Sequence, residues 1–241
     1  MDFELSEEQE MLRDVSRSML STHGTPELVR AVADADRDLD DKLWQRGTEL
    51  GWTGMAVPEQ QEGAGMGLVE LCLVAEEIGR AAAPGPFVDT ALAALAAARG
   101  GAPDDVVSGL AVGELKASVV QRSTPTLAHA AGSVDWLLVL DGTEASLVEA
   151  TTVTCHRRTT LDRSRGWWAV DLSSATPAHV LATGEDARWL LDAATVLTAA
   201  DLLGVGEWLL AATVSYAGVR EQFGRPIGSF QVVKHKAADM L

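Results

Sequence analysis

A long apolar segment, residues 187–219, is the feature that most limits how this chain can fold. It has helical periodicity, contains no proline and carries few charges, so it predicts one uninterrupted helix spanning on the order of 50 Å. Its apolar residues lie on more than one helix face, which requires burial on more than one side. In a chain of 241 residues, we expect a partner subunit or further sequence to supply that cover. A second helix, expected from Phe230 up to Leu241, also leaves an apolar face to be covered.

The sequence before this segment is first helix-rich and then strand-rich. Ser6 and Gln9 have the spacing of a capping box, and helical periodicity recurs in 40–50, 68–83 and 89–99. Short runs of β-branched and aromatic residues between turn residues indicate strands at 117–121, 136–140, 147–154 and 167–172. We therefore predict a mainly α fold with a small, mostly antiparallel β domain. The predicted domains are an N-terminal helical domain (1–113), a shortened β domain (114–182) and the start of a C-terminal helical bundle (183–241).

The charge balance excludes several classes of partner. The formal net charge is −16 and the sequence pI is about 4.6. Nucleic acid binding depends on Lys and Arg meeting phosphates, and anionic membrane surfaces also attract basic segments. We therefore expect neither nucleic acid nor a membrane surface as a partner, although a local cluster of Arg can still bind a phosphate-bearing cofactor.

The cysteines, histidines and apolar runs predict a cytoplasmic protein without a metal site. Cys72 and Cys155 are not in a CxxC or Cys/His pattern, and the histidines show no metal-ligand spacing. No signal peptide is expected at the N-terminus. Acidic residues interrupt the most apolar stretches, so no clean run of the ~20 residues needed for a membrane span is expected; these residues are Asp192, Asp201 and Glu207.

The segment 220–231 concentrates the residues suited to binding a cofactor. Gly224 and Gly228 permit turn conformations and Pro226 stops a helix, so a tight connection between two helices is expected. Arginine offers a rigid fork of donors for a pyrophosphate, amide side chains can bond a ribose or adenine, and phenylalanine can pack on a ring. An ordinary helix–turn–helix loop with solvated charges explains the same spacing equally well.

The motifs resemble those of the acyl-CoA dehydrogenase family. Segment 220–231 has the form R-x-Q-F-G-x-P-I-G-x-F-Q, and K-H-x-x-A-D-M follows at 234–240. Nearer the N-terminus, G-W-T-G-M-A-V-P-E at 51–59 and the P-G-P-F turn at 84–87 also look like this family. The resemblance implies a helical domain, a β domain and a helical bundle. It further implies tetramers in which FAD is shared across a dimer interface.

The resemblance also implies which residues reach the flavin. Arg220, Phe223 and Gln231 match the family residues that contact FAD bound mainly by a neighbouring subunit, and Gln222 occupies a position that also approaches it. Arg220 would pair with the pyrophosphate, and Gln231 would face the adenosine half. The expected reaction converts an acyl-CoA thioester to a trans-2-enoyl-CoA.

The chain departs from the family pattern at the flavin ring and at the catalytic base. Where members have T-E-P-x-x-G-S-D, this chain has 118–123, S-V-V-Q-R-S, and the β domain looks shortened by tens of residues. A minority of members carry the catalytic Glu on the long helix, and the corresponding residue here is Ala194. The catalytic residue of this chain is therefore unknown. Glu185, Asp186 and Asp192 lie nearby; only Asp192 has a suitable helical phase, and a solvated residue is the simpler interpretation. These departures resemble the short subunit of heterotetrameric members that act on steroid-derived CoA thioesters.

Three hypotheses follow. In the first, the chain is one subunit of an acyl-CoA dehydrogenase complex and completes a flavin site with a longer subunit. In the second, it is a degenerate, non-catalytic partner that stabilises a hetero-oligomer. In the third, it belongs to a homo-oligomeric enzyme whose C-terminal third is absent from this sequence.

Overall fold

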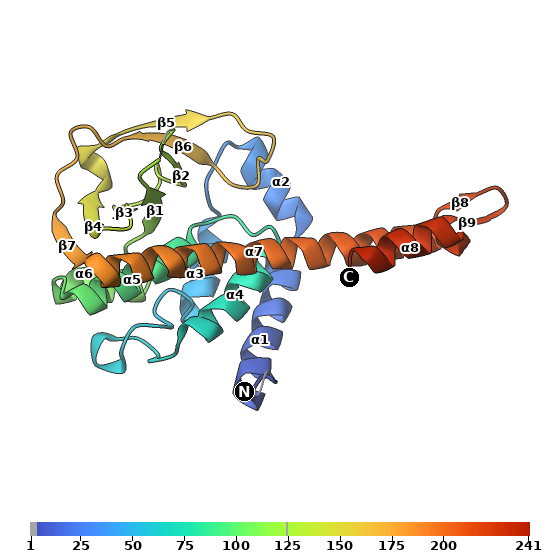
Figure 1. Ribbon diagram of the computed structural model, residues 1–241, viewed down its shortest axis with the longest axis horizontal. Helices are drawn as coiled ribbons and strands as arrows, with labels where there is room; N and C mark the ends of the chain where they lie inside the picture. Colours follow the sequence, from blue (N-terminus) through green and yellow to red (C-terminus); the bar gives the residue numbers. More distant parts are fainter. Residues whose placement is uncertain (1–3, 124) are drawn as a thin grey trace.

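The computed structural model describes residues 4–123 and 125–241 (Figure 1); residues 1–3 of the predicted first domain lie outside the described residues. The helices are α1 (Glu7–His23), α2 (Pro26–Asp34), α3 (Asp41–Glu49), α4 (Leu68–Arg80), α5 (Phe87–Gly100), α6 (Asp104–Ala111), α7 (Gly184–Val219) and α8 (Gln231–Asp239). The strands are β1 (Ala117–Gln121), β2 (Leu127–His129), β3 (Trp136–Leu140), β4 (Glu144–Glu149), β5 (Thr154–Arg158), β6 (Trp167–Asp171), β7 (His179–Thr183), β8 (Glu221–Gln222) and β9 (Arg225–Pro226). Single 3-10 turns occur at Glu59–Gln61, Ala150–Thr152 and Ile227–Ser229.

The capping box predicted at the first helix is present and connects α1 to α4. The Ser6 hydroxyl accepts the Gln9 N–H at 3.2 Å, and the Ser6 N–H donates to Gln9 Oε1 at 3.0 Å. Gln9 Nε2 donates to Glu70 at 2.7 Å, and Arg17 makes two hydrogen bonds, 2.6 and 2.9 Å, to the buried Glu77 of α4. Because both pairs cross from α1 to α4, the N-terminal helix is fixed to the helix that α7 crosses.

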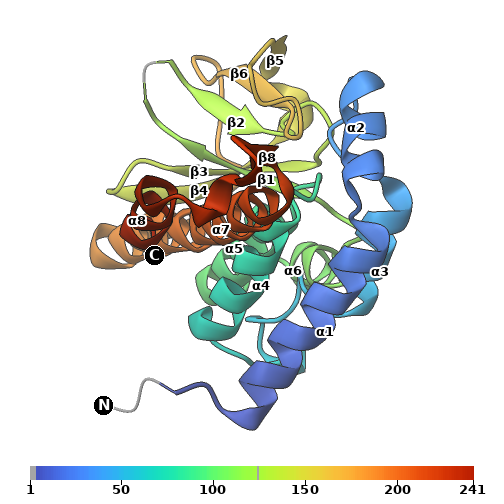
Figure 2. The ribbon, with the colours of Figure 1, turned by 90° about the vertical axis from the view of Figure 1, so that its right-hand side faces the viewer.

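Two small sheets lie on one side of α7, and α4 lies on the other (Figures 1 and 2). The first sheet has the order β1-β3-β4-β7; β1 pairs in parallel with β3, and the other pairs are antiparallel. The second sheet, β2-β6-β5, is antiparallel. The fold is therefore mainly α with a small, mostly antiparallel β part, as predicted. Strands β2 and β7 and helix α6 were not predicted from the sequence, and the predicted strand at 147–154 crosses the end of β4 and the following 3-10 turn.

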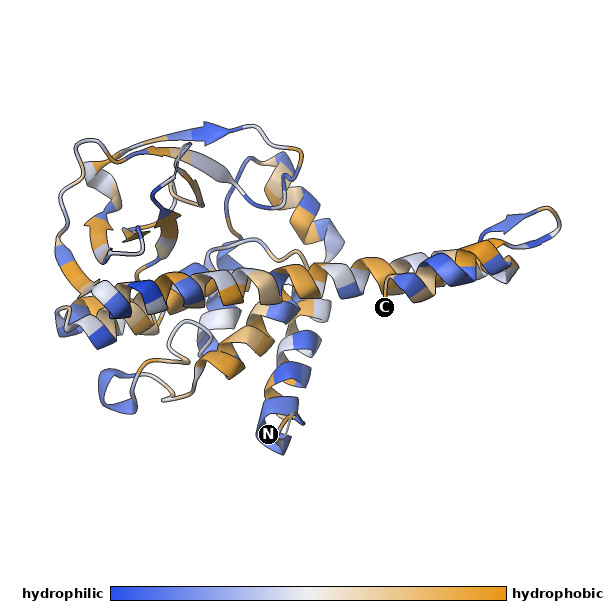
Figure 3. Ribbon diagram, viewed as in Figure 1, coloured by the Kyte–Doolittle hydropathy of each residue, from blue (hydrophilic) through white to orange (hydrophobic). Residues whose placement is uncertain are grey.

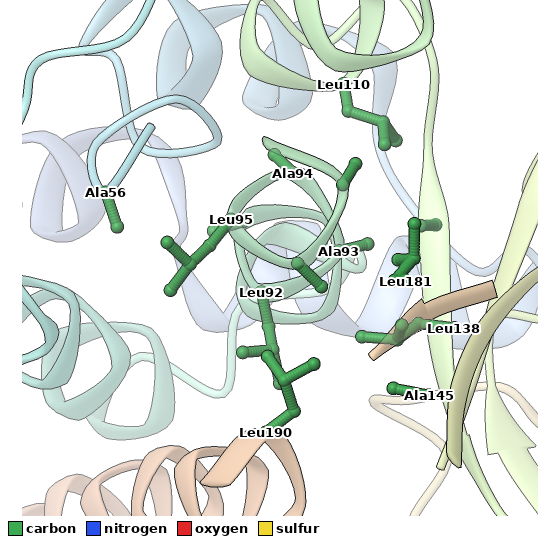
Figure 4. Close-up of a cluster of buried hydrophobic side chains, with 14 of the residues drawn as sticks. Ala56, Leu92, Ala93, Ala94, Leu95, Leu110, Leu138, Ala145, Leu181 and Leu190 are labelled. Carbon is green, nitrogen blue, oxygen red and sulfur yellow. The ribbon is translucent and has the colours of Figure 1, made fainter. Parts of the chain in front are cut away.

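The largest hydrophobic core surrounds α5. In Figure 4, Leu92 of α5 meets Leu190 of α7, and Ala93 faces Leu138 and Leu181 of the first sheet. The core therefore takes side chains from all three predicted domains. The boundaries at 113 and 182 stay predictions.

Close approach of α4 and α7 depends on one glycine from each helix. A Cβ at Gly79 would lie 1.9 Å from the carbonyl oxygen of Asp201, and one at Gly204 would lie 1.8 Å from that of Glu76. No side chain fits at either distance. The two glycines therefore bring the helix backbones into contact, and this contact fixes where α7 runs over the body of the protein.

Among the described residues, most of the cover on α7 lies over its first half. Its second half projects away from the body, with α8 alongside (Figure 1), and apolar residues remain along the projection (Figure 3). The large exposed apolar residues of α7 are Val196, Leu202, Leu203, Trp208, Leu209, Val214, Tyr216 and Val219. Contrary to the sequence-based expectation, α7 is long and apolar enough to cross a membrane by length and composition, alone among the helices of the described residues. The predicted continuous helix is confirmed, and the described residues leave these apolar side chains exposed.

Candidate cofactor-binding arm and cavity

Residues 220–231 form a projecting hairpin at the end of α7, which we call the arm (Figure 1). Strands β8 and β9 pair through Gln222 and Arg225, so the loop between them has two residues, Phe223 and Gly224. Their φ angles are 54° and 76°, as a type I′ turn requires. A glycine adopts this conformation freely, whereas a bulky residue with positive φ is a strained outlier. Phe223 is therefore held in an unfavourable conformation at the tip of the arm.

Phe223 is also 92% exposed. Its ring meets Phe230 edge-on, with centroids 6.1 Å apart, and the Arg225 guanidinium lies 4.2 Å from the centre of the Phe230 ring. The stacking of Arg225 was not anticipated from the sequence. Together the three side chains brace the tip while leaving one face of Phe223 open.

The other predicted cofactor residues are also exposed on the arm or next to it. Arg220 forms no ion pair with any residue from 4–123 or 125–241. The Gln222 amide donates to its neighbouring carbonyl, that of Glu221, at 2.9 Å, and Gln231 Nε2 lies 3.3 Å from His235 Nε2. The arm thus gathers all four predicted residues in one place, and their role in cofactor binding stays a prediction.

The end of the chain is basic although the chain as a whole is acidic. From residue 220 onward there are four cationic side chains (Arg220, Arg225, Lys234 and Lys236) and two acidic ones (Glu221 and Asp239). This part therefore carries a formal charge of +2 in a chain of net charge −16. A local positive potential of this kind attracts an anion such as a pyrophosphate.

A cavity of about 490 Å³ lies between the start of α5, strands β1 and β2, and α7. Ala194 lines it and is nearly buried, so this position of the long helix offers a methyl group and no carboxylate. Asp192 does not line this cavity; it is exposed and lies 3.6 Å from Arg188. Asp192 is therefore a solvated residue, the simpler of the two interpretations.

The loop between β5 and β6 closes one side of the cavity. Arg165 in this loop makes two hydrogen bonds to Asp201 of α7, at 2.5 and 2.6 Å. Two further arginines reach the N-terminal region: Arg157 of β5 bonds the buried Asp38 at 2.9 Å, and Arg163 in the loop donates to the Ala33 carbonyl at 2.7 Å. The loop is thus tied to two parts of the chain distant in sequence.

Two titratable side chains in the cavity wall have strongly shifted pKa values. Burial raises the pKa of Asp89 to about 6, although the Val119 N–H donates to its carboxylate at 3.1 Å. Burial, with a smaller contribution from Arg165, lowers the pKa of His129 to about 3. The cavity therefore holds a neutral imidazole and a partly desolvated carboxylate.

The arm suits the phosphates of a dinucleotide, and the cavity does not. Three carboxylates line the cavity (Asp89, Asp162 and Asp201), and its one guanidinium, Arg165, is already paired with Asp201. The arm instead offers Arg220 without an ion pair and an open aromatic face. Within the described ranges, no group of three or more His, Cys, Asp or Glu is placed to hold a metal ion.

Comparison with known proteins identifies the family. Residues 6–105 match the N-terminal domain of acyl-CoA dehydrogenase, and residues 185–241 match its C-terminal domain. A curated acyl-CoA dehydrogenase is 34% identical over 98% of this chain. The chain belongs to the acyl-CoA dehydrogenase family, whose members depend on FAD.

The relatives include steroid-type enzymes. The 34% identical protein is acyl-CoA dehydrogenase IpdE2 of Mycolicibacterium smegmatis, and the match covers 73% of it. A variant of the Tcur3481–Tcur3483 steroid ACAD superposes with a TM-score of 0.83 at 31% identity, over 97% of this chain and 73% of that one. The ChsE4–ChsE5 complex from Mycobacterium tuberculosis gives a TM-score of 0.83 at 28% identity, over 99% and 74%. The predicted family, fold class and resemblance to steroid-type members are confirmed.

Proposed function

We propose that this chain is a subunit of an FAD-dependent acyl-CoA dehydrogenase complex, in which its arm completes a flavin site formed mainly by a second, longer chain. The observation that carries this proposal is Phe223, which is at once strained and 92% exposed. Strain of this kind is retained chiefly where it serves binding or catalysis, and solvent exposure of an aromatic face gives no stability in return. A ring of the cofactor packed on that face explains both.

The position of the arm favours another chain as the site of the flavin. Arg220 follows Asp201, which lines the cavity, by 19 residues along α7, which corresponds to roughly 28 Å of helix. The arm therefore cannot serve this chain's own cavity, whose acidic lining also repels phosphates. A cofactor that touches the arm has to be held by a neighbour.

The reaction we assign to the complex is α,β-dehydrogenation of an acyl-CoA thioester to a trans-2-enoyl-CoA. When bound, FAD supplies the acceptor for the hydride that leaves the β-carbon. A carboxylate has to remove the α-proton, and Ala194 cannot do so. In this proposal the base comes from the longer chain, while Arg220, Phe223, Gln222 and Gln231 hold and orient the cofactor.

We further propose that the second half of α7 is covered by protein rather than by lipid, in a heterotetrameric, cytoplasmic complex. Glu207 of α7 bonds Arg80 of α4 at 3.2 Å, and such a charged pair is costly inside a bilayer. Two of the similar solved structures carry the names of two proteins each, the ChsE4–ChsE5 complex and the Tcur3481–Tcur3483 steroid ACAD. Similarity to the Tcur3481–Tcur3483 steroid ACAD also supports a steroid-derived CoA thioester as substrate.

One observation favours a purely structural partner as an alternative. The exposed apolar residues of α7 would bind another subunit whether or not the arm touches a cofactor. This alternative predicts that changes in the arm leave flavin binding intact.

The test is Arg220→Ala in the complex with the longer chain. Removing a charged hydrogen-bond donor from a phosphate should cost about 1–3 kcal/mol, which corresponds to roughly 5- to 150-fold weaker flavin binding. Lys236→Ala is the matched control, because it removes a positive charge from α8 outside the arm. Flavin dissociation constants would be measured by equilibrium titration. Equal values for Arg220→Ala and the parent complex would favour the structural alternative.

A further inference from the structure

The arm has two arginines, and the structure places them in different surroundings. Arg220 follows directly after α7, at the base of the arm, whereas Arg225 lies in β9, next to its tip. Neither forms an ion pair with a residue of 4–123 or 125–241. The Arg225 guanidinium lies 4.2 Å from the centre of the Phe230 ring, a distance at which a cation is attracted to the face of an aromatic ring. Arg225 therefore already has a partner, and that partner is a ring.

Phe230 connects Arg225 to the tip of the arm. Its ring is partly buried and meets the Phe223 ring edge-on, with centroids 6.1 Å apart and an angle of 88° between the planes. The Phe230 N–H donates to the Ile227 carbonyl at 3.2 Å, and the Phe230 carbonyl accepts the Lys234 N–H at 3.2 Å. Because these bonds hold the Phe230 backbone at the start of α8, its ring is a fixed support for Phe223.

Phe223 needs such a support in order to bind well. Its side chain is 92% exposed, and an exposed side chain is free to change rotamer unless a neighbour holds it. Ordering a mobile side chain at an interface costs free energy, and this cost lowers affinity. A Phe223 ring that rests on Phe230 before binding avoids part of that cost.

The register of the hairpin keeps Arg225 on the ring. Gln222 pairs with Arg225, and Glu221 pairs with Pro226. Successive side chains of a strand point to opposite faces, so Glu221, the acidic residue of the arm, is turned away from Arg225. A planar guanidinium stacked on a ring is held in one orientation. If Arg225 left this position to reach a phosphate, Phe230 would lose its cover.

We propose that Arg225 is a positioning residue, which stacks on Phe230 and thereby holds the Phe223 ring in the orientation that packs on the cofactor. This inference rests on the proposed function, in which Phe223 packs on a flavin held by the longer chain. It divides the work of the two arginines: Arg220 meets the pyrophosphate, and Arg225 acts through the two rings without touching the cofactor.

The free chain tests the support in the absence of any cofactor. The sequence has four phenylalanines, so ¹³C labelling of their rings gives few signals, and the Phe223–Phe230 contact can be followed as a nuclear Overhauser effect. We expect Arg225→Ala to reduce this effect by about half or more, because the stacking partner is gone. Arg225→Lys should restore it only in part, since an ammonium lacks the planar fork, and Lys236→Ala is the control that should match the parent. An unchanged contact in Arg225→Ala would refute the positioning role.

Flavin binding by the complex tests whether Arg225 acts through Phe223. Arg225→Ala should raise the dissociation constant about 2- to 5-fold, the range for one exposed cation–π contact. When Phe223→Ala is already present, adding Arg225→Ala should change the constant no further. The same loss in both backgrounds would show that Arg225 contacts the cofactor itself and would overturn the inference. Flavin binding by Phe223→Ala equal to that of the parent complex would instead contradict the proposed function, on which the ring contact in the free chain does not depend.

Discussion

Phe223 combines an unfavourable backbone conformation with an exposed aromatic side chain. Stability alone would favour Asn or Gly at the first position of this turn, yet the chain has Phe223 with a φ of 54°. The sequence identifies the motif, but it does not reveal this strain, since the sign of φ depends on the pairing of β8 with β9. Residue type and backbone geometry together point to an aromatic contact outside the chain.

Phe223→Asn should separate stability from cofactor binding. Asn followed by Gly224 is a favoured type I′ pair, so we expect the hairpin to gain about 1 kcal/mol, seen as slower amide exchange at Ile227, whose N–H donates to the Arg220 carbonyl at 2.8 Å. Flavin binding by the complex should weaken at the same time, because the aromatic face is gone. Phe223→Tyr keeps the ring and is the control. Tighter or unchanged flavin binding in Phe223→Asn would contradict the assigned role.

Because the pKa of buried His129 is lowered, this residue reduces the stability of the folded chain as the pH falls. Its pKa is lowered to about 3 in the folded chain by burial and by Arg165, against an opposing effect of Asp162, while an unfolded histidine has a pKa near ~6.5. As the pH falls below about 6.5, the unfolded chain takes up a proton that the folded chain refuses, so folding loses free energy. His129→Phe removes this loss.

We therefore expect the free energy of unfolding of His129→Phe to rise relative to the parent by about 2 kcal/mol between about pH 7 and about pH 4.5. Urea denaturation at both pH values measures it. Asp89 has the opposite sign in part of this range, because its raised pKa favours the folded state as the pH falls; it is present in both proteins and cancels in the difference. A constant difference between the two proteins would show that His129 titrates normally.

Ion pairs between residues far apart in the chain could not be predicted from the sequence. Arg165 and Asp201 are 36 positions apart, and Arg157 and Asp38 are 119 apart; no periodicity connects them. The arm residues could be predicted because they are close together in the chain.

At the scale of elements, α7 is the best-predicted part of the fold. The predicted segment 187–219 contains no proline and few charges, and the helix runs unbroken from Gly184 to Val219. The short strand β2 could not be predicted as well, since three residues leave too little pattern to separate strand from loop. The position of α7 was not predictable either. It depends on Gly79 and Gly204, which in the sequence are only residues of low helix propensity. The structure shows that they lie where α4 and α7 cross.

Gly204→Ala tests the importance of that crossing. Its Cβ would lie 1.8 Å from the Glu76 carbonyl oxygen, so the helices must separate, and we expect a loss of at least about 2 kcal/mol in the free energy of unfolding. Gly206→Ala is the matched control on the same helix. A Cβ at Gly206 would meet no atom within 4 Å, so alanine should stabilise the helix by roughly 0.5–1 kcal/mol. Similar effects of the two changes in urea denaturation would mean that α4 and α7 do not pack this closely.

At the scale of the whole molecule, an acidic body carries a basic, projecting end. The body has a core of its own around α5, whereas the second half of α7 exposes a continuous series of apolar residues. The apolar residues of segment 187–219 predicted a helix that needs cover by other protein, and the structure shows that the exposed part lies mostly in its second half. A subunit that lends its arm to a neighbour accounts for the exposed helix, the basic charge and the strained Phe223 together.

The central claim is that this chain completes a flavin site held by another chain. The most direct measurement is the visible absorption spectrum of the chain purified alone and of the same chain produced together with a longer acyl-CoA dehydrogenase subunit. We predict a colourless protein alone and a yellow complex that contains both chains. A yellow protein with FAD bound in the absence of any partner would contradict the claim and show that this chain holds flavin by itself.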